Sequence, residues 1–210
     1  MICTALSSKD FEMTRKLASQ CELAEIRIDL SEFTKEQVKE LFSFHKNLVA
    51  TCRPGKLSEQ ERKELLYKAI ENGAKYVDIE IESDNEFKKE LITLARKHKC
   101  WVIISYHNFE LTPTREELES IVSQCFIQGA DVAKVATMIQ KPSDNADILS
   151  LFTQGKRIVA IGMGQLGKIT RVAAPMLGAE FTFAASSDGR VTALGQVSDV
   201  ELKKLIELIK

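Results

Sequence analysis

One pattern repeats along the chain: a short apolar segment typical of a buried strand is followed by a longer segment whose apolar residues have helical spacing. This pattern predicts strands over residues 2–6, 24–29, 48–52, 76–80, 101–105, 131–136, 157–161 and 181–183. It predicts a helix that is capped by Ser7 or Ser8 and runs to about Gln20, and a helix over residues 58–72 that begins with a capping box of Ser58 and Glu61. Further helices are predicted over residues 34–44, 85–97, 112–128, 144–152, 169–177 and 200–209. The chain therefore alternates strand and helix from end to end.

Eight strand–helix units in one chain favour an α/β fold of the closed (β/α)8 TIM-barrel type. A doubly wound open sheet is the alternative, but such a sheet rarely needs eight evenly repeated units. The 210 residues are enough for one substantial core, and no linker or low-complexity segment divides them. We therefore expect residues 1–210 to form a single barrel domain.

Composition argues against several kinds of partner. The formal net charge of −1 gives no indication of nucleic acid, and no apolar run has membrane-spanning length. The first residues lack the basic flank and apolar core of a signal peptide. The five cysteines are scattered without a Cys-x-x-Cys pair, which favours reduced thiols and a cytoplasmic location. Three histidines without paired spacing make a zinc site unexpected.

Charged side chains alternate with apolar ones on two of the predicted strands. Glu25, Arg27 and Asp29 are two residues apart, as are Asp78 and Glu80, so each set shares one face of its strand. On an open sheet this alternation is typical of a strand that faces water. In a closed barrel the helices cover the outer face, so these charges should point inward and pair near the mouth.

A lysine interrupts one of the predicted buried strands. Lys134 lies among small and β-branched residues in the segment GADVAKVA at 129–136, where a positive charge is costly. One explanation is that Lys134 snorkels to water or pairs with Asp131. The other is a nucleophilic amine kept neutral by its surroundings and ready to attack a carbonyl, with Ala133 and Ala136 leaving room for a ring.

Polar residues follow other strands at the edge where a barrel enzyme has its site. His107 follows the strand next to that of Lys134, so the two side chains are expected to share one substrate. A histidine at a strand end is often only a hydrogen-bonded structural residue, but it also titrates near neutrality and suits acid–base catalysis. The remaining residues expected at this edge are Glu25, Arg27, Asp29, Arg53, Asp78, Glu80, Arg171 and Gln196.

A glycine-rich segment, GMGQLG at 162–167, satisfies the Gly-x-Gly-x-x-Gly pattern. The dinucleotide interpretation lacks its acidic residue at the end of the next strand. The P-loop interpretation has Ile169 where the magnesium-binding Ser or Thr should follow Lys168. The segment is better interpreted as a loop after the seventh strand, whose backbone N–H groups are available to an anion.

These residues together resemble the type I 3-dehydroquinate dehydratases, the Schiff-base dehydratases of the shikimate pathway. The pieces that carry the resemblance are EIRID at 25–29, DIE at 78–80, SYHNF at 105–109, ADVAKV at 130–135, MGQLGKITR at 163–171 and ALGQ at 193–196. The resemblance implies a (β/α)8 barrel, usually a homodimer, that dehydrates 3-dehydroquinate to 3-dehydroshikimate without a metal or organic cofactor.

The resemblance also implies a role for each matching residue. Lys134 would form an imine with the substrate ketone, His107 would act as the general acid and base, and Glu80 would orient His107 and favour its imidazolium form. Arg171 would grip the substrate carboxylate. The residues implied to bind hydroxyl groups or close the site are Glu25, Arg27, Arg53, Thr192 and Gln196, and those implied to form an apolar wall are Phe109, Met163 and Phe183.

Two other functions remain open at this point. A Schiff-base aldolase on the same fold is the nearest enzymatic alternative, although Arg171 and the pair of Glu25 and Arg27 suit a carboxylated, hydroxylated ring better than a sugar phosphate. A nucleotide-binding protein that uses residues 162–170 is the alternative from another class.

Overall fold

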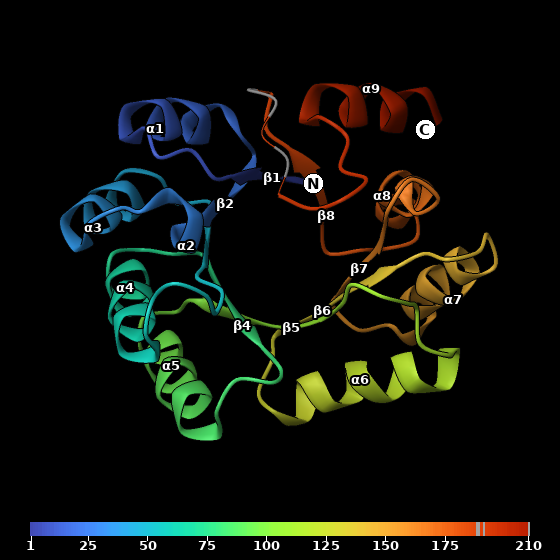
Figure 1. Cartoon of the computed structure of the whole chain (residues 1–210), viewed down its shortest axis with the longest axis horizontal. Coiled ribbons are helices and arrows are strands. Elements are labelled where there is room, and N and C mark those ends of the chain that lie inside the picture. The colour runs from blue at the N-terminus through green and yellow to red at the C-terminus, as the bar shows by residue number, and fades with distance from the viewer. Residues whose placement is uncertain (188–189, 191, 210) are drawn as a thin grey trace.

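The computed structural model describes residues 1–187, 190 and 192–209, and its described strands form one parallel eight-stranded sheet. The strand order is β7-β6-β5-β4-β3-β2-β1-β8 (Figure 1). The backbone N–H of Glu180, just before β8, donates to the carbonyl of Ile158 in β7 at 3.0 Å and joins the two ends of the sheet. The strands are β1 Ile2–Leu6, β2 Leu23–Arg27, β3 Leu48–Thr51, β4 Tyr76–Glu80, β5 Trp101–Asn108, β6 Val132–Met138, β7 Ile158–Met163 and β8 Thr182–Ala185.

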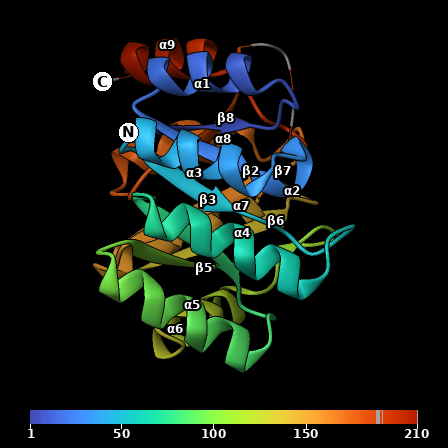
Figure 2. The same ribbon diagram turned by 90° about the vertical axis from the view of Figure 1, so that its left-hand side faces the viewer.

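Helices alternate with these strands and surround the sheet, as the predicted (β/α)8 barrel requires (Figures 1 and 2). They are α1 Phe11–Gln20, α2 Ile28–Ser31, α3 Lys35–Phe44, α4 Glu59–Glu71, α5 Asn85–Lys97, α6 Arg115–Ile127, α7 Asp144–Ser150, α8 Lys168–Ala173 and α9 Asp199–Ile209, with short 3-10 turns at Leu151–Gln154 and Ala174–Met176. Within the described ranges, no helix has the length and apolar character needed to cross a membrane.

Local sequence explains where the helices begin. Ser58 caps α4 in a capping box with Glu61, as predicted, because each side chain accepts a hydrogen bond from the other's backbone N–H. The expected cap of α1 is wrong. The carboxylate of Asp10 accepts from the backbone N–H of Met13 and starts the helix there, whereas the Ser8 hydroxyl accepts from the N–H of Asp10 and shapes the preceding turn.

Two strand boundaries differ from the prediction in ways that affect the site. β2 ends at Arg27, and Asp29 lies in the short helix α2 rather than on the strand. Asp29 nevertheless returns to Arg27, since its carboxylate accepts two hydrogen bonds from that guanidinium, at 2.7 and 3.1 Å. β5 continues to Asn108 instead of ending at Ser105, which places His107 on the strand itself.

The barrel has an outer and an inner apolar cluster, which follow from the alternation of side chains along each strand. Ile26, Val77, Ile79 and Ala133 belong to the outer cluster, which lies between the sheet and the helices. The inner cluster fills the barrel up to the site, where its last members form one wall, and it consists of Cys3, Leu23, Val49, Tyr76, Ile103, Val132, Ala136, Val159, Ile161, Met163, Phe181 and Phe183. This packed floor leaves space for a ligand only at the carboxyl ends of the strands.

The connection between β8 and α9 contains Ser-Ser-Asp-Gly-Arg at 186–190, a sequence that predicts a turn or hairpin, but its Asp188 and Gly189 lie outside the described residues. The described part after it is anchored to the loop that follows β7. The backbone N–H of Gly164 donates to the carbonyl of Leu194 at 3.2 Å, and Gly195 adopts a positive φ of 75° beside Gly164. This contact holds the loop that carries Gln196 over the mouth of the barrel.

Candidate active site

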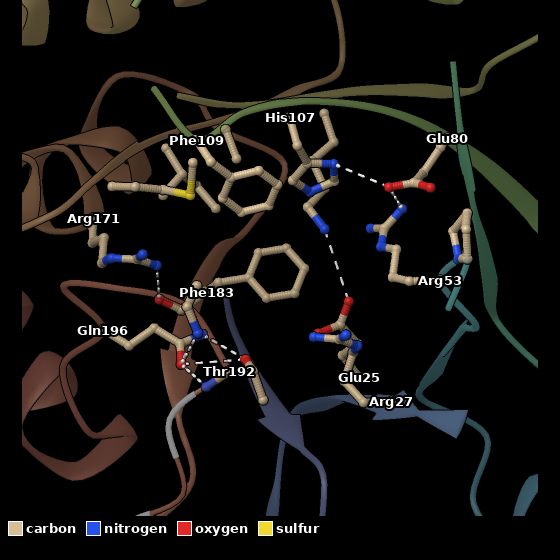
Figure 3. A pocket seen from close by; sticks show the side chains of 16 residues that line it. Glu25, Arg27, Arg53, Glu80, His107, Phe109, Arg171, Phe183, Thr192 and Gln196 are labelled. Carbon is tan, nitrogen blue, oxygen red and sulfur yellow. Dashed lines mark hydrogen bonds and ion pairs between the residues drawn. The ribbon is translucent and has the colours of Figure 1, made fainter. Parts of the chain in front are cut away.

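A cavity of about 440 Å³ opens at the carboxyl ends of the strands (Figure 3). Every side chain implied to act in the site lines it: Glu25, Arg27, Arg53, Glu80, His107, Phe109, Lys134, Met163, Arg171, Phe183, Thr192 and Gln196. Pro54, Ala136, Ile161 and Ala193 complete the lining. Residues from β2, β4, β5, β6, β7 and β8 therefore meet in one place, as the barrel topology predicts.

Lys134 lies at the base of this cavity and is only 5% exposed. Its Nζ donates a hydrogen bond to Asp78 at 2.9 Å, lies 3.8 Å from the Glu25 carboxylate and is 4.5 Å from the centre of the Phe183 ring. Asp131 instead pairs with Arg96, at 2.5 Å, at the other end of the strand. Snorkelling and pairing with Asp131 are therefore both wrong, and the amine points into the barrel.

The importance of Asp78 was not recognised from the sequence, although its place on the inward face of β4 was predicted. Asp78 is 2% exposed and lies next to three donors. Besides Lys134, it accepts from Ser105 Oγ at 2.6 Å and pairs with Arg53 at 2.9 Å. Burial alone would raise the pKa of Asp78, but Arg53 and Lys134 lower it far below its ordinary value. The group is therefore a carboxylate at any ordinary pH.

His107 lies beside Lys134 because β5 and β6 are neighbouring strands. Ser105 is opposite Lys134 in the register, and His107 is two residues nearer the mouth, opposite Ala136. Its ring stacks on Phe109 at 6.0 Å between centroids. Burial, then the charges of Arg53 and Lys134, lower the pKa of His107 well below its ordinary value. A neutral imidazole can accept a proton, which is what a general base must do.

The relation of Glu80 to His107 differs from the expectation. The nearest Glu80 oxygen is 3.8 Å from His107 Nδ1, too far for a hydrogen bond, and that nitrogen has no hydrogen-bond partner among the described residues. The same oxygen lies 3.5 Å from Arg53 (Figure 3). Arg53 offsets the negative charge of Glu80 and places its own positive charge near His107, so the Glu80 carboxylate does not make imidazolium the favoured form.

Arg171 is the least satisfied charge of the described part of the cavity. The side chain is 1% exposed, yet its only hydrogen bond there runs from NH1 to the carbonyl of Phe183 at 3.1 Å. Its Nε and NH2 have no hydrogen-bond partner among the residues that the structure describes, and burial lowers the pKa of Arg171 to about 10. A buried, unpaired guanidinium is costly unless an anion completes it, so this side of the cavity is suited to a carboxylate.

The other two arginines of the cavity are paired within the protein. Arg27 donates to Asp29, and although burial alone would lower the pKa of Arg27, the charges of Asp29 and Glu25 raise it above its ordinary value. Arg53 donates to Ser105 Oγ at 2.9 Å and pairs with Asp78. Their outer edges remain available to hydroxyl groups because both side chains also line the cavity.

One wall of the cavity is apolar. Ile161 and Met163 from β7, Phe183 from β8 and Ala136 from β6 form it, opposite the charged residues of β2 and β4. The expectation that Ala133 leaves room beside the amine is wrong, because its side chain faces the outer cluster. Ala136 shares the inward face with Lys134 and does line the cavity.

The loop that closes the cavity is held by Gln196. Its Oε1 accepts from the backbone N–H of Thr192 at 2.8 Å and of Ala193 at 3.3 Å, and its Nε2 donates to Thr192 Oγ1 at 3.0 Å. Thr192 and Gln196 thus form one small unit at the mouth (Figure 3).

The glycine-rich loop after β7 uses its own backbone N–H groups. Gly162 N–H donates to Thr170 Oγ1 at 2.8 Å, Gly167 N–H to the Gly164 carbonyl, and Gly164 N–H to Leu194. Gly167 packs so closely on Gly162 that an added Cβ would lie 2.3 Å from its carbonyl. These three glycines therefore shape the loop and position Arg171, and they do not offer a phosphate the N–H groups that a nucleotide site requires.

Fold and site together define a class of protein: a (β/α)8-barrel enzyme with a buried strand lysine beside a histidine and an unpaired arginine. Within the described ranges, no three His, Cys, Asp or Glu side chains are grouped so that they could hold a metal ion. The model of the type I 3-dehydroquinase family matches residues 2–210, and the chain belongs to this family.

Individual relatives agree with this assignment. A 3-dehydroquinate dehydratase of Methanococcus maripaludis (strain C5) is 36% identical over 222 residues, which cover 100% of both chains. The solved type I 3-dehydroquinate dehydratase of Clostridium difficile, with covalently modified comenic acid, is 26% identical with a TM-score of 0.86, covering 99% of this chain and 91% of the other. The corresponding structure from Aquifex aeolicus is 26% identical with a TM-score of 0.85, covering 100% and 99%.

Proposed function

We propose that this protein dehydrates 3-dehydroquinate to 3-dehydroshikimate, a step of the shikimate pathway, through an imine on Lys134. The observation that carries the proposal is the presence in one cavity of a buried amine and a buried, unpaired guanidinium. The substrate has a ketone for the first and a carboxylate for the second. Membership of the type I family supports the same reaction.

The reaction begins when Lys134, which is paired with Asp78, passes one proton to the neutral ring of His107, and the freed amine attacks the ketone carbon. The carbinolamine hydroxyl takes that proton back and leaves as water, and the remaining protonated imine is an electron sink for the neighbouring carbon. The proton on that neighbouring carbon, α to the imine, becomes much more acidic than it is in the ketone. No metal or organic cofactor is required, because the protein's own lysine supplies the electron sink.

His107 moves the proton in the elimination. Its neutral ring accepts the α proton, the electron pair forms the new C=C bond with loss of the β-hydroxyl, and the imidazolium returns the proton to that hydroxyl, which leaves as water. Glu80, 3.8 Å from Nδ1, stabilises the transient imidazolium by its charge rather than by a hydrogen bond. Water then hydrolyses the imine and frees Lys134.

The remaining side chains bind and enclose the ring. Arg171 holds the carboxylate, the edges of Glu25, Arg27 and Arg53 bind hydroxyl groups, and Thr192 and Gln196 close the mouth. Phe109, Met163 and Phe183 pack on the apolar faces of the ring. A Schiff-base aldolase acting on a sugar phosphate fits less well, since the glycine N–H groups after β7 are already used.

Three further properties belong to this proposal. The chain acts as one domain over residues 1–210, since the family model matches residues 2–210, and as a homodimer, which is what its resemblance to the type I enzymes implies. It works in the cytoplasm, since its five cysteines are free thiols.

The test is to trap the imine. The protein is incubated with 3-dehydroquinate, reduced with borohydride and digested, and the adduct is located by mass spectrometry. We expect modification at Lys134, and loss of both adduct and turnover in Lys134→Ala. Lys88→Ala is the matched control, because Lys88 is also buried but bonds to the Ile81 carbonyl and Gln128, away from the cavity. Turnover that persists in Lys134→Ala would refute the mechanism.

A further inference from the structure

Asp78 is placed differently from every other charged group near Lys134. Asp78 does not line the cavity, yet its carboxylate lies 2.9 Å from the Lys134 amine. The Glu25 carboxylate is farther from that amine, at 3.8 Å. Glu25 lines the cavity and accepts a hydrogen bond from Thr51 at 2.9 Å. Asp78 therefore contacts the reacting nitrogen from below, where a bound substrate would not displace it.

The position of Asp78 is fixed from two sides. Ser105, which is fully buried, donates to one carboxylate oxygen at 2.6 Å, and Arg53 pairs with the other at 2.9 Å. In the backbone register Ser105 lies opposite Glu80, two residues beyond Asp78 on the inward face of the barrel, and its hydroxyl reaches the Asp78 carboxylate from there. A carboxylate held this firmly keeps its place while the amine changes into an imine.

We propose that Asp78 is the counter-ion of the protonated imine on Lys134, held in place by Ser105. This inference rests on the proposed function. The imine nitrogen keeps one proton, which it donates to the Asp78 carboxylate in place of the amine's hydrogen bond. The negative charge stabilises the iminium, and only the iminium form withdraws electrons strongly enough for His107 to remove the α proton.

The charge balance around the nitrogen supports the need for a counter-ion. The arginines that surround it, Arg27 on β2, Arg53 in the loop after β3 and Arg171 on α8, are otherwise a strong reason for an imine to lose its proton. Charged or titratable groups around Lys134 are Glu25, Arg27, Arg53, Asp78, Glu80, His107 and Arg171. Asp78 remains ionised throughout, because Arg53 and Lys134 lower its pKa far below the ordinary value although burial alone would raise it.

Single-turnover rates of Asp78→Asn between pH 5 and 10 test the proposal. The asparagine keeps the shape of the side chain but removes the charge. Loss of an opposite charge within about 4–6 Å changes an ionisation by roughly 1–3 pH units, so the basic limb of the rate profile should move down by that amount. Above the new limb the rate falls about tenfold per pH unit. Because Asp78 does not line the cavity, KM should change much less than kcat.

Two variants make the result unambiguous. Asp131→Asn removes a carboxylate at the opposite end of β6, where it pairs with Arg96, and should leave the pH profile unchanged. Ser105→Ala removes the hydroxyl that holds Asp78 and should move the basic limb in the same direction by less. If Asp78→Asn does not fold, Ser105→Ala decides alone.

Trapping separates this proposal from the proposed function. A wild-type protein that cannot be trapped at Lys134 refutes the imine and the counter-ion together. Both the imine and the counter-ion are supported if the wild type is trapped at Lys134 and Asp78→Asn is trapped at acidic pH but progressively less as the pH rises. Only the counter-ion proposal is refuted if the imine forms in the wild type but the basic limb of Asp78→Asn coincides with that of the wild type. Where Asp78→Asn does not fold, the same outcome in Ser105→Ala refutes it.

Discussion

Arg171→Met is expected to make the protein more stable and a much poorer catalyst. The arginine is 1% exposed, and its Nε and NH2 have no partner among the described residues. Burial lowers the pKa of Arg171 to about 10, which means that the fold bears the cost of the charge at neutral pH. At about 1.4 kcal/mol for each pKa unit, that cost is roughly 3 kcal/mol. Methionine has a similar volume and no charge to bury.

The stability gain is smaller than this figure, because the hydrogen bond from Arg171 to the Phe183 carbonyl is lost, at about 1 kcal/mol. We expect a net gain of about 1–2 kcal/mol, or a rise in Tm of roughly 2–8 °C for a chain of this size. Binding changes in the opposite sense. Two charge-assisted hydrogen bonds to a carboxylate are worth about 3–6 kcal/mol, so kcat/KM should fall by about 10²–10⁴.

Calorimetric unfolding and steady-state kinetics on the same samples test both effects. Arg157→Met is the control, because Arg157 is half-exposed, pairs with Glu180 at 3.2 Å and lies over the Trp101 ring at the other end of the barrel. It should lose a little stability and no activity. The reasoning is refuted if Arg171→Met lowers Tm, or if its kcat/KM remains within about threefold of the wild type.

Two more predictions concern His107 and the closing loop. Since burial lowers the pKa of His107, the neutral base persists below pH 6.5, and the acidic limb of kcat/KM should lie there. The unfolded chain binds a proton on His107 near pH 6.5 and the folded chain does not, so the free energy of unfolding falls as the pH drops below 6.5. In His107→Ala, melting curves should lose this pH dependence and rate profiles should lose the acidic limb. Imine trapping should persist in that variant, and turnover should slow about 10²–10⁴-fold. In Gly195→Ala the new Cβ would lie 2.2 Å from the Gly164 carbonyl, so the closing loop should move and KM should rise about tenfold. Gly178→Ala is the control, because Gly178 also has a positive φ but has open space around it, and this variant should keep its kinetics. Equal KM values in the two variants would disprove the steric argument.

Much of this fold was predictable because its determinants are local. The eight strands could be located from apolar runs, and capping boxes such as that of Ser58 and Glu61 mark where helices begin. The period of two along a strand then predicted which charges face inward. Lys134 illustrates the step: its neighbours in sequence gave a buried strand, and the closed barrel left only the interior for its amine.

What could not be predicted depends on distances between strands. The sequence placed Asp78 and Lys134 on inward faces, but only the barrel's stagger brings their side chains to 2.9 Å. The same applies to Glu80, which was expected to orient His107 and lies nearer to Arg53, at 3.5 Å, than to His107, at 3.8 Å. Pairing among several charges is a competition, and its outcome depends on differences of an ångström that no spacing in the sequence encodes.

That competition also orients the substrate. Arg27 and Arg53 each have a carboxylate partner within the protein, and Lys134 has Asp78, so an incoming carboxylate gains least by approaching them. Arg171 has no such partner in the described part of the chain, and in Figure 3 it lies on the opposite side of the cavity from Arg53. The carboxylate is therefore directed to Arg171, which leaves the ketone end of the ring to face Lys134. The pairing of the other cations is thus as important for the reaction as the isolation of Arg171, because a second unpaired cation would permit the ring to bind in reverse.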